Sequence, residues 1–352
     1  MGLIEKLEQI KTLVENGAGG GSSEDWEISN CAFLCRYGQN AELFLNNQNK
    51  LNKNKIDSFE DMFYFCFDNN YWGKYNDIEM PTTFTLKGNF PNVKTAYRMF
   101  FQCKLEEVDL SELNISNCTN ISYLFGQMSN LKKVYMPKIE TNIQGSTNAA
   151  VSYLFYSCSN LSDENIILET PYSITPTNCI MTYCFSSLGE KTSPFSLNMF
   201  KYFNYGGTNS MNTMFSYPRT SSTGGVKDIY NIDFSYVSNT NSCAIFGTST
   251  TNSCNKFCHL VPVEGSVIGV NTAQTAIALT LNNIWRGSAD SIPNWDTDGW
   301  TLGQYFEEFA NALGTNESGY VRQIKIYTNL YNTLSDEQKA ILTNKNYTIT
   351  YG

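Results

Sequence analysis

The sequence predicts an α/β fold in which one short unit of structure repeats along the chain. Three observations predict it: a phenylalanine that recurs at intervals of 25 to 37 residues, a helix-like apolar pattern around it, and a strand-like alternation after it. Repeats of about 20 to 50 residues are typical of chains whose units stack on one another. We therefore expect a solenoid of short helix plus short strand units. The recurring residues are Phe33, Phe63, Phe100, Phe125, Phe155, Phe185, Phe215 and Phe246.

The apolar pattern around each phenylalanine predicts the helix of the unit. In the unit of Phe125, the other apolar residues are Ile121, Leu124 and Met128, at offsets of −4, −1 and +3. This spacing places all four side chains in one stripe of a two-turn amphipathic helix. We therefore expect a short helix at each phenylalanine, with the stripe facing the core.

A short strand is predicted after two of these helices. Leu105, Val108 and Leu110 follow Phe100, and the segment NLKKVYMP after Phe125 is arranged in the same way. Both segments end with an apolar residue at every second position, which is typical of a half-buried strand. A unit of one helix and one strand cannot bury its own apolar face, so neighbouring units must stack.

Two stretches resemble a known family of repeats. VSYLFYSCSNL (Val151 to Leu161) and VDLSELNISNCTNISYLFGQMSNLKKV (Val108 to Val134) are similar to the BspA-type leucine-rich repeats of surface proteins. The match covers the units between Phe100 and Leu161, whereas the units near Phe63, Phe185, Phe215 and Phe246 keep the helical pattern and blur the strand. The resemblance implies a leucine-rich-repeat-like solenoid with a role in surface display and binding.

Residues 1–23 are predicted to form a docking or oligomerisation helix and a glycine-rich linker. Leu3, Leu7, Ile10 and Val14 have the spacing of a two-heptad coiled-coil seam. A helix this short is marginal in water, so we expect it to bind a partner. The glycines that follow it are typical of flexible coil. This N-terminal segment lacks the basic and apolar regions of a secretory signal, so we expect synthesis in the cytoplasm without export.

The rest of the chain divides into a repeat body, residues 24–285, and a C-terminal α+β cap, residues 286–352. Within the cap, the apolar spacing predicts a helix over residues 300–313, with Gly314 as its C′ residue. A second helix is predicted to start at the capping box that Ser335 opens. The predicted strands contain Ile324 and Ile326 before this helix, and Tyr347, Ile349 and Tyr351 after it.

Charge and hydropathy exclude two classes of partner. The formal net charge is −9, which opposes a basic footprint for nucleic acid. No apolar run approaches about eighteen residues, so no insertion into a membrane is expected.

The eleven cysteines are interpreted as core residues. Cys66, Cys103 and Cys158 stand at the position that other units fill with Met128 and Leu188. A thiol at such a position behaves as a small buried hydrophobe. We therefore expect reduced thiols and no framework of disulfides.

Candidate metal and catalytic residues are few. Cys254, Cys258 and His259 form C-x-x-x-C-H, which matches neither haem attachment nor a zinc site with a second pair, and packing is the favoured interpretation. Asp296 and Asp298 resemble a fragment of a calcium loop without its closing glutamate, which favours an ordinary turn. The chain has one histidine and no nucleophile elbow. We expect no enzyme activity and no cofactor.

The tryptophans allow two interpretations. Trp72, Trp285, Trp295 and Trp300 could form apolar platforms for sugar rings, or they could pack in the core. The core is favoured, because most aromatic residues of a repeat are buried in it.

These features together resemble a bacteriophage appendage, similar to the head-fibre or tail-fibre proteins of phages of Bacteroides-type gut bacteria, including crAss-like phages. That resemblance implies a homo-oligomer, a dimer or trimer, on the virion surface. The N-terminal arm would bind a capsid or tail structural protein, and the repeats would bind a glycan or protein of the host surface. The alternatives are a cellular BspA-like adhesin or interaction scaffold, and a carbohydrate-active enzyme.

Overall fold

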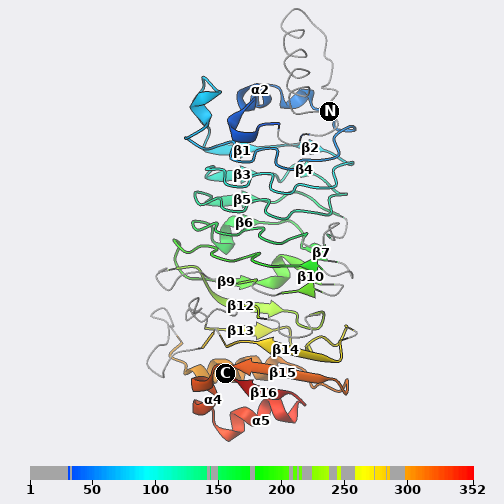
Figure 1. Cartoon of the computed structure of the whole chain (residues 1–352), viewed down its shortest axis with the longest axis vertical. Coiled ribbons are helices and arrows are strands. Elements are labelled where there is room, and N and C mark those ends of the chain that lie inside the picture. Colours follow the sequence, from blue (N-terminus) through cyan, green and yellow to red (C-terminus); the bar gives the residue numbers. More distant parts are fainter. Residues whose placement is uncertain are drawn as a thin grey trace, which may run out of the picture.

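The computed structural model describes residues 31, 34–140, 143, 150–174, 179–205, 209–211, 214–215, 224–237, 244–246, 258–272, 274–282, 284–285 and 298–352. It is a mixed α/β structure with few helices and several small parallel sheets. The molecule is elongated, with α2 at one end, α4 and α5 at the other, and the strands between them (Figure 1).

The helices lie mainly at the two ends of the described chain. The α-helices are α2 (Ala41–Asn46), α3 (Leu302–Ala312), α4 (Thr328–Thr333) and α5 (Asp336–Asn344). The 3-10 helices are η1 (Arg36–Gly38), η2 (Gln48–Lys50), η3 (Trp72–Lys74), η4 (Asp163–Asn165) and η5 (Met199–Lys201). In the described residues, no helix has the length and apolar character needed to cross a membrane.

The strands are short. They are β1 (Thr83–Thr85), β2 (Gly88–Asn89), β3 (Glu107–Asp109), β4 (Leu113–Asn114), β5 (Lys133–Tyr135), β6 (Ile166–Ile167), β7 (Tyr172–Ile174), β8 (Cys179–Ile180), β9 (Phe195–Asn198), β10 (Phe203–Tyr205), β11 (Asn209–Ser210), β12 (Val226–Ile232), β13 (Leu260–Pro262), β14 (Ala276–Thr280), β15 (Val321–Ile326) and β16 (Thr348–Tyr351). The strands predicted after Phe100 and Phe125 are confirmed as β3 and β5, each with one buried central valine.

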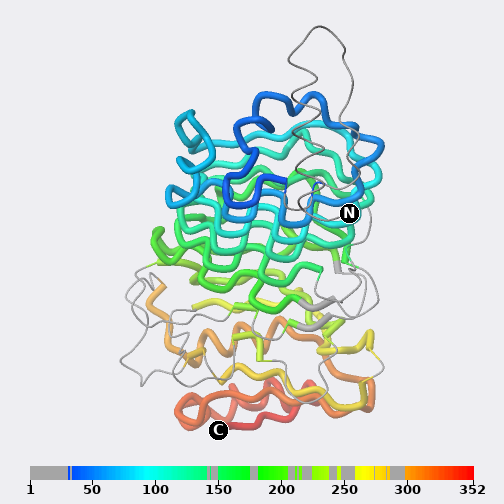
Figure 2. The backbone as a smooth tube through the Cα atoms, turned by 45° about the horizontal axis from the view of Figure 1, so that its top comes forward, coloured from blue at the N-terminus to red at the C-terminus, as the bar shows by residue number. Residues whose placement is uncertain are grey.

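Strands of successive units pair in parallel. The largest sheet has the order β1-β3-β5-β6, in which Val108 of β3 lies opposite Phe84 of β1 and Val134 of β5. The other sheets are β13-β12-β9, β14-β15-β16, β2-β4, β10-β7 and β11-β8. Successive turns of the backbone therefore lie one above another, as the tube in Figure 2 shows.

The segments around the phenylalanines are turns, and the prediction that they are helices is wrong. In the unit of Phe125, the Leu124 N–H donates to the carbonyl of Ile121 at 3.1 Å. Two more turns of this kind follow, over residues 123–126 and 125–128, and each overlaps the turn before it. Tyr123 and Gln127 have φ of +56° and +59°, and a left-handed residue at every fourth position cannot belong to an α-helix. The equivalent pairs are Asp61 and Phe65, Arg98 and Gln102, Tyr153 and Ser157, and Tyr183 and Ser187.

Backbone hydrogen bonds between units explain why turns replace helices. The Tyr123 N–H donates to the Ser152 carbonyl of the next unit at 3.0 Å, and the Phe125 N–H donates to Leu154 at 3.2 Å. Alternate N–H groups thus bond across units, while those between them close the turns. Buried backbone donors need acceptors, and the hydrogen bonds of a helix would all lie within one unit. The turn conformation instead ties each unit to its neighbour.

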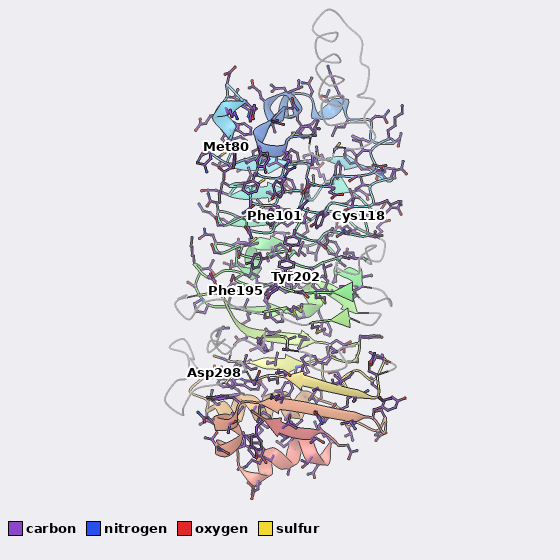
Figure 3. The ribbon with its side chains drawn as sticks, in the orientation of Figure 1. Met80, Phe101, Cys118, Phe195, Tyr202 and Asp298 are labelled. Atoms are coloured by element: carbon purple, nitrogen blue, oxygen red, sulfur yellow. The ribbon has the colours of Figure 1, made fainter. Side chains whose placement is uncertain are left out.

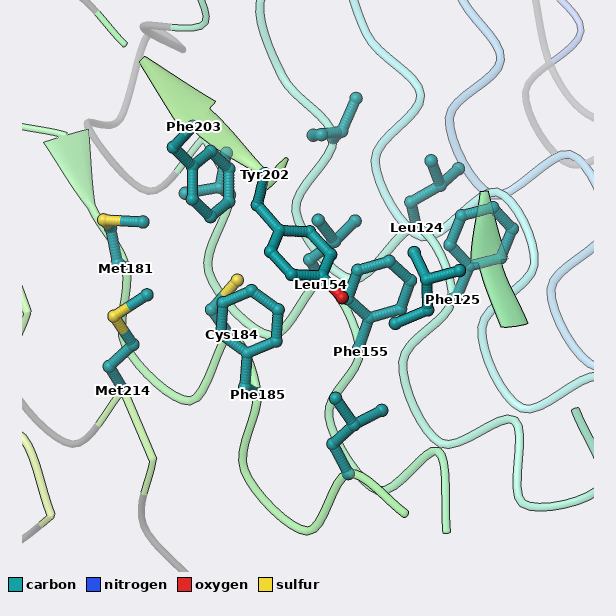
Figure 4. Packing of buried hydrophobic residues seen from close by; sticks show 14 of the residues in the cluster. Leu124, Phe125, Leu154, Phe155, Met181, Cys184, Phe185, Tyr202, Phe203 and Met214 are labelled. Carbon is teal, nitrogen blue, oxygen red and sulfur yellow. The ribbon is translucent and has the colours of Figure 1, made fainter. Parts of the chain in front are cut away.

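The recurring phenylalanines form a continuous stack inside the molecule, seen in part in Figure 4. All seven from Phe63 to Phe246 have no exposed surface, whereas Phe33 lies outside the described residues. The ring centroids are separated by 5.1 Å for Phe63–Phe100, 5.8 Å for Phe100–Phe125, 5.9 Å for Phe125–Phe155, 6.0 Å for Phe155–Phe185, 5.6 Å for Phe185–Phe215 and 5.9 Å for Phe215–Phe246.

The cysteines of the repeat pack beside this stack. Cys66, Cys103 and Cys158 are fully buried and free of disulfides, as the sequence predicts. The Cys158 Sγ donates to the Phe125 carbonyl at 3.0 Å, and Cys103 bonds to Phe63 at 2.9 Å. Burial raises the pKa of both Cys103 and Cys158 to about 12, so these thiols stay protonated at neutral pH.

The C-terminal helices agree with the sequence, with one correction. The helix predicted over residues 300–313 is confirmed as α3, and the capping box of Ser335 is confirmed at the start of α5. Gly314, however, is not a left-handed C′ residue, because its φ is not positive. A Cβ at Gly314 would lie 2.2 Å from the carbonyl oxygen of Gly265, so close backbone packing requires this glycine.

The sheet of β14, β15 and β16 includes strands from both sides of the domain boundary predicted at residue 286. β14 pairs with β15 over five residues, and β15 pairs in turn with β16. The C-terminal segment therefore continues the parallel stacking of the body. At the other end, Phe44 of α2 packs its ring edge on Phe63, with 5.3 Å between centroids, and covers that end of the stack.

Candidate binding face

A second set of aromatic side chains runs along the outside of the units, and we call it the outer aromatic row. Tyr71 is exposed and the other members are half-buried. Figure 3 labels one member, Phe101. The row consists of Tyr37, Tyr64, Phe65, Tyr71, Tyr97, Phe101, Tyr123, Tyr153, Tyr156 and Tyr183.

The turn conformation places the middle of this row. Tyr123, Tyr153 and Tyr183 each stand two residues before a core phenylalanine, and their φ values are +56°, +59° and +55°. Leu124 and Phe125, which follow Tyr123, are buried in the core. The left-handed residue therefore points its ring away from the core, on the opposite side of the backbone.

The rings of the outer aromatic row touch one another from unit to unit. Tyr123 and Tyr153 stack with 4.2 Å between centroids and 7° between planes, and Tyr183 follows at 5.0 Å from Tyr153. In the other direction, Phe101 lies 5.5 Å from Tyr123 and 5.4 Å from Tyr64. Contacts of 4.8 to 6.0 Å extend the row to Tyr37, Phe65 and Tyr71.

Two guanidinium groups lie over the row near its N-terminal end. The Cζ atoms of Arg36 and Arg98 are 4.8 and 5.2 Å from the centroid of the Tyr64 ring. The Arg98 Nη2 donates to the buried Asp61 carboxylate at 2.7 Å. Burial raises the pKa of Asp61, although the hydrogen bond and charge of Arg98 lower it. This pairing fixes the Arg98 guanidinium beside the rings.

Amide groups flank the stacked rings. The Gln102 Nε2 donates to the Gln127 Oε1 at 2.6 Å, at the second left-handed position of two successive units. Tyr123 and Tyr153 use ring faces against each other, and each half-buried ring also carries a hydroxyl group. Such a surface combines apolar contact with hydrogen-bonding groups, as binding faces rich in tyrosine do.

The predicted arm cannot be placed. Leu3, Leu7, Ile10 and Val14 lie outside the described residues, as does the glycine-rich linker. The predicted docking helix therefore stays a prediction.

The tryptophans largely follow the core interpretation. Trp72 and Trp285 are buried, and Trp300 is half-buried against the ring of His259, with 5.0 Å between centroids. Trp295 lies outside the described residues. The platform interpretation is wrong for Trp72 and Trp285.

His259, the single histidine, lies between two carboxylates. Its Nδ1 is 2.5 Å from Glu308 Oε2 of α3, and its Nε2 is 2.7 Å from Asp298 Oδ2, a residue labelled in Figure 3. Burial lowers the pKa of His259, but the hydrogen bonds to Glu308 and Asp298 outweigh burial and raise the pKa to about 9. Its backbone N–H donates to Asp228 at 3.3 Å. The protonated ring joins the repeat body to the C-terminal helices.

This arrangement leaves His259 little scope as a ligand or base. Both ring nitrogens are bound to carboxylates, and a protonated imidazole has no lone pair for a metal. Cys258 is buried, and its carbonyl accepts the Trp285 indole N–H at 2.9 Å. Cys254 and Asp296 lie outside the described residues. Across the part of the chain that the structure describes, no three His, Cys, Asp or Glu side chains are placed so that they could hold one metal ion.

The sequence contains one signal for the outer aromatic row, and the spacing of apolar residues does not reveal it. Tyr123, Tyr153 and Tyr183 recur two residues before the phenylalanine in three consecutive units. On a helix, that position would lie away from the buried stripe, where a half-exposed tyrosine needs no explanation.

A scan against protein-family models finds no match for this chain, and searches of curated proteins and of solved structures find none either.

Proposed function

We propose that this chain is a non-enzymatic binding protein whose repeat units form a solenoid, displayed as a head or tail appendage of a virion. The observation that carries the binding role is the outer aromatic row. The Phe stack already fills the core, so the row is not needed to build one. A contiguous aromatic surface that remains partly exposed is typical of interaction sites, where tyrosine and arginine contribute much of the binding energy.

The solenoid is supported by the backbone. Strands of successive units pair in parallel, and alternate N–H groups of the turns bond to the next unit. A solenoid presents equivalent positions of each unit at a regular spacing along one side. An extended ligand, such as a host-surface glycan or protein, would contact several units of the outer aromatic row at once.

Display on a particle is supported by the sequence pattern of the arm. Leu3, Leu7, Ile10 and Val14 would bury against a capsid or tail protein, or against sister arms in a dimer or trimer. The linker would let each body move, and several bodies on one particle would turn weak contacts into strong overall binding.

The state of His259 argues against histidine-dependent catalysis. A histidine whose two ring nitrogens are held by Glu308 and Asp298 is not available as a general base.

The test is adhesion of the purified full-length chain to cells of a Bacteroides-type host. A Tyr123→Ser, Tyr153→Ser double variant should lose most of the binding, because it removes the two stacked rings in the middle of the row. Serine occupies the second left-handed position of two units, at Ser157 and Ser187, so we expect the variant to fold. Tyr320→Ser, which removes an exposed tyrosine of the C-terminal region, should bind as the wild type does. Equal adhesion of all three proteins, with circular dichroism showing a folded double variant, would refute the role of the row.

The virion part is tested separately. A Leu7→Asp, Ile10→Asp variant should be missing from purified particles while the body stays folded. Normal incorporation of that variant would contradict the arm as an anchor.

A further inference from the structure

A hollow of about 560 Å³ opens beside α2, at the N-terminal end of the stack. It is separate in composition from the outer aromatic row, because none of its lining residues belongs to that row. The lining residues are Gln39, Asn40, Glu42, Leu43, Asn46, Tyr75 and Asn76. The volume falls within the range of about 300 to 1,000 Å³ that is usual for small-molecule sites.

Asn76 is the buried residue of the lining. Its side chain is almost fully buried, and its Oδ1 accepts the Glu42 N–H at 2.9 Å. Its Nδ2 donates to the carbonyls of Gly38 and Trp72, at 2.9 and 3.0 Å. Glu42 is held in turn, since its Oε2 accepts the Asp77 N–H at 3.1 Å. A single buried amide thus joins two backbone segments beside the hollow, residues 38–42 and residues 72–76.

The chain that enters the hollow is held in a conformation that few residues adopt. Tyr37, Gly38 and Asn40 have φ of +56°, +77° and +56°. The Asn40 Nδ2 donates to the Leu34 carbonyl at 3.2 Å and stabilises this path. Left-handed residues also occur in the turns of the repeat units, and here the surrounding hydrogen bonds hold them beside the hollow.

The lining has the chemistry of a site for hydroxyl groups. Four carboxamides and one carboxylate surround it, and amides both donate and accept hydrogen bonds. Leu43 and the ring of Tyr75, which is 42% exposed, supply apolar surface for the C–H face of a sugar ring. Glu42 is the charged group of the lining, so an acidic sugar would be repelled. The apolar seam of the arm, by contrast, does not match this lining.

We propose that the hollow binds one or two rings of a neutral glycan. The choice of a glycan rests on the proposed adhesive function, whereas the site itself rests on the lining. The outer aromatic row would contact the extended part of the glycan, and the hollow would bind its uncharged terminal sugars.

The test is calorimetric titration of the full-length chain with a panel of neutral oligosaccharides, namely mannotriose, cellotriose and triacetylchitotriose, and with trigalacturonic acid. We expect at least one neutral sugar to bind and the acidic sugar not to bind. Tyr75→Ala and Asn46→Ala should each weaken that binding by about tenfold. Tyr320→Ala is the matched control, because Tyr320 is also 42% exposed and also has a cation over its ring. It should leave the affinity unchanged.

A Glu42→Gln variant gives an independent readout. It should keep the neutral affinity within about twofold and admit trigalacturonic acid. The inference is overturned if no neutral sugar of the panel binds, or if Tyr75→Ala and Asn46→Ala bind as the control does. Those outcomes do not contradict the proposed function if the Tyr123→Ser, Tyr153→Ser variant still loses adhesion. If that variant adheres as the wild type does while neutral sugars bind in the hollow, the proposed function is refuted and this inference is not.

Discussion

The ring of Tyr153 lies parallel to the ring of Tyr123 on the outer surface, with 4.2 Å between centroids and 7° between planes. Two residues further along each unit, the rings of Phe155 and Phe125 are parallel inside the core, at 5.9 Å and 6°. The two stacks share one backbone ladder, in which Phe125 N–H bonds to Leu154. The spacing of the units therefore sets the spacing of both stacks.

The stacking of Tyr123 on Tyr153 should be measurable as a coupling energy. We expect a double-mutant cycle of Tyr123→Ala and Tyr153→Ala to give about 0.5 to 1.5 kcal/mol, as aromatic pairs do. The measurement is urea unfolding of the four proteins. A coupling energy near zero would show that the rings are neighbours without mutual stabilisation.

The Phe stack should dominate stability. Phe155 has no exposed surface and stacks on both Phe125 and Phe185, so Phe155→Ala should lower the free energy of unfolding by about 3 to 5 kcal/mol. Phe200 is 48% exposed, and Phe200→Ala should change the free energy of unfolding by less than about 0.5 kcal/mol. Similar losses in both variants, measured by urea unfolding, would contradict the division between core and surface.

The positions of the core residues could be predicted from the sequence, but their backbone conformation could not. Ile121, Leu124, Phe125 and Met128 are all buried, as the stripe predicts. A helix and a chain of overlapping turns give the same burial pattern here, so apolar spacing alone does not separate them. The difference lies in left-handed residues such as Tyr123, and tyrosine carries no local preference that marks such a position.

Long-range contacts account for the rest of what the sequence did not reveal. The capping boxes of α3 and α5 are local signals, and the one at Ser335 was found from the sequence. His259, Asp298 and Glu308 meet only because β13 packs on α3, and no short motif encodes that meeting. Likewise, Asn76 reaches the hollow from a segment more than thirty residues beyond Glu42.

The stability of the protein should fall as the pH rises through about 9. The pKa of His259 is raised from 6.5 to about 9 in the folded state, so its contribution is full below pH 6.5 and lost as pH rises through 9. The partners Asp298 and Glu308 are partly exposed, so screening reduces the contribution to about 1 to 2 kcal/mol. Urea unfolding at pH 6 and pH 8 measures the part of the loss that precedes ionisation of the cysteine thiols, because the raised folded-state pKa values of Cys103 and Cys158 also lower stability at higher pH. Between pH 6 and pH 8, His259→Gln should remove the pH dependence, and its persistence in the variant would assign it to another group.

Replacement of Gly314 tests the close approach of two backbone segments. In Gly314→Ala, the new Cβ would lie 2.2 Å from the Gly265 carbonyl oxygen, and a backbone atom cannot move aside as a flexible side chain can. The Gly314 N–H also bonds to the Ser266 carbonyl at 2.9 Å, so separating the segments would break this bond. We expect the free energy of unfolding to fall by more than about 2 kcal/mol.

Gly73 provides the matched control. A Cβ there would meet no atom within 4 Å, and its φ is not positive, so Gly73→Ala should leave the free energy of unfolding within about 0.5 kcal/mol of the wild type. Thermal unfolding followed by circular dichroism compares the two variants directly. If Gly314→Ala unfolds at the same temperature as Gly73→Ala, the segments of Gly265 and Gly314 can separate at little cost. The C-terminal helices would then be held by other contacts, including those of His259 with Asp298 and Glu308.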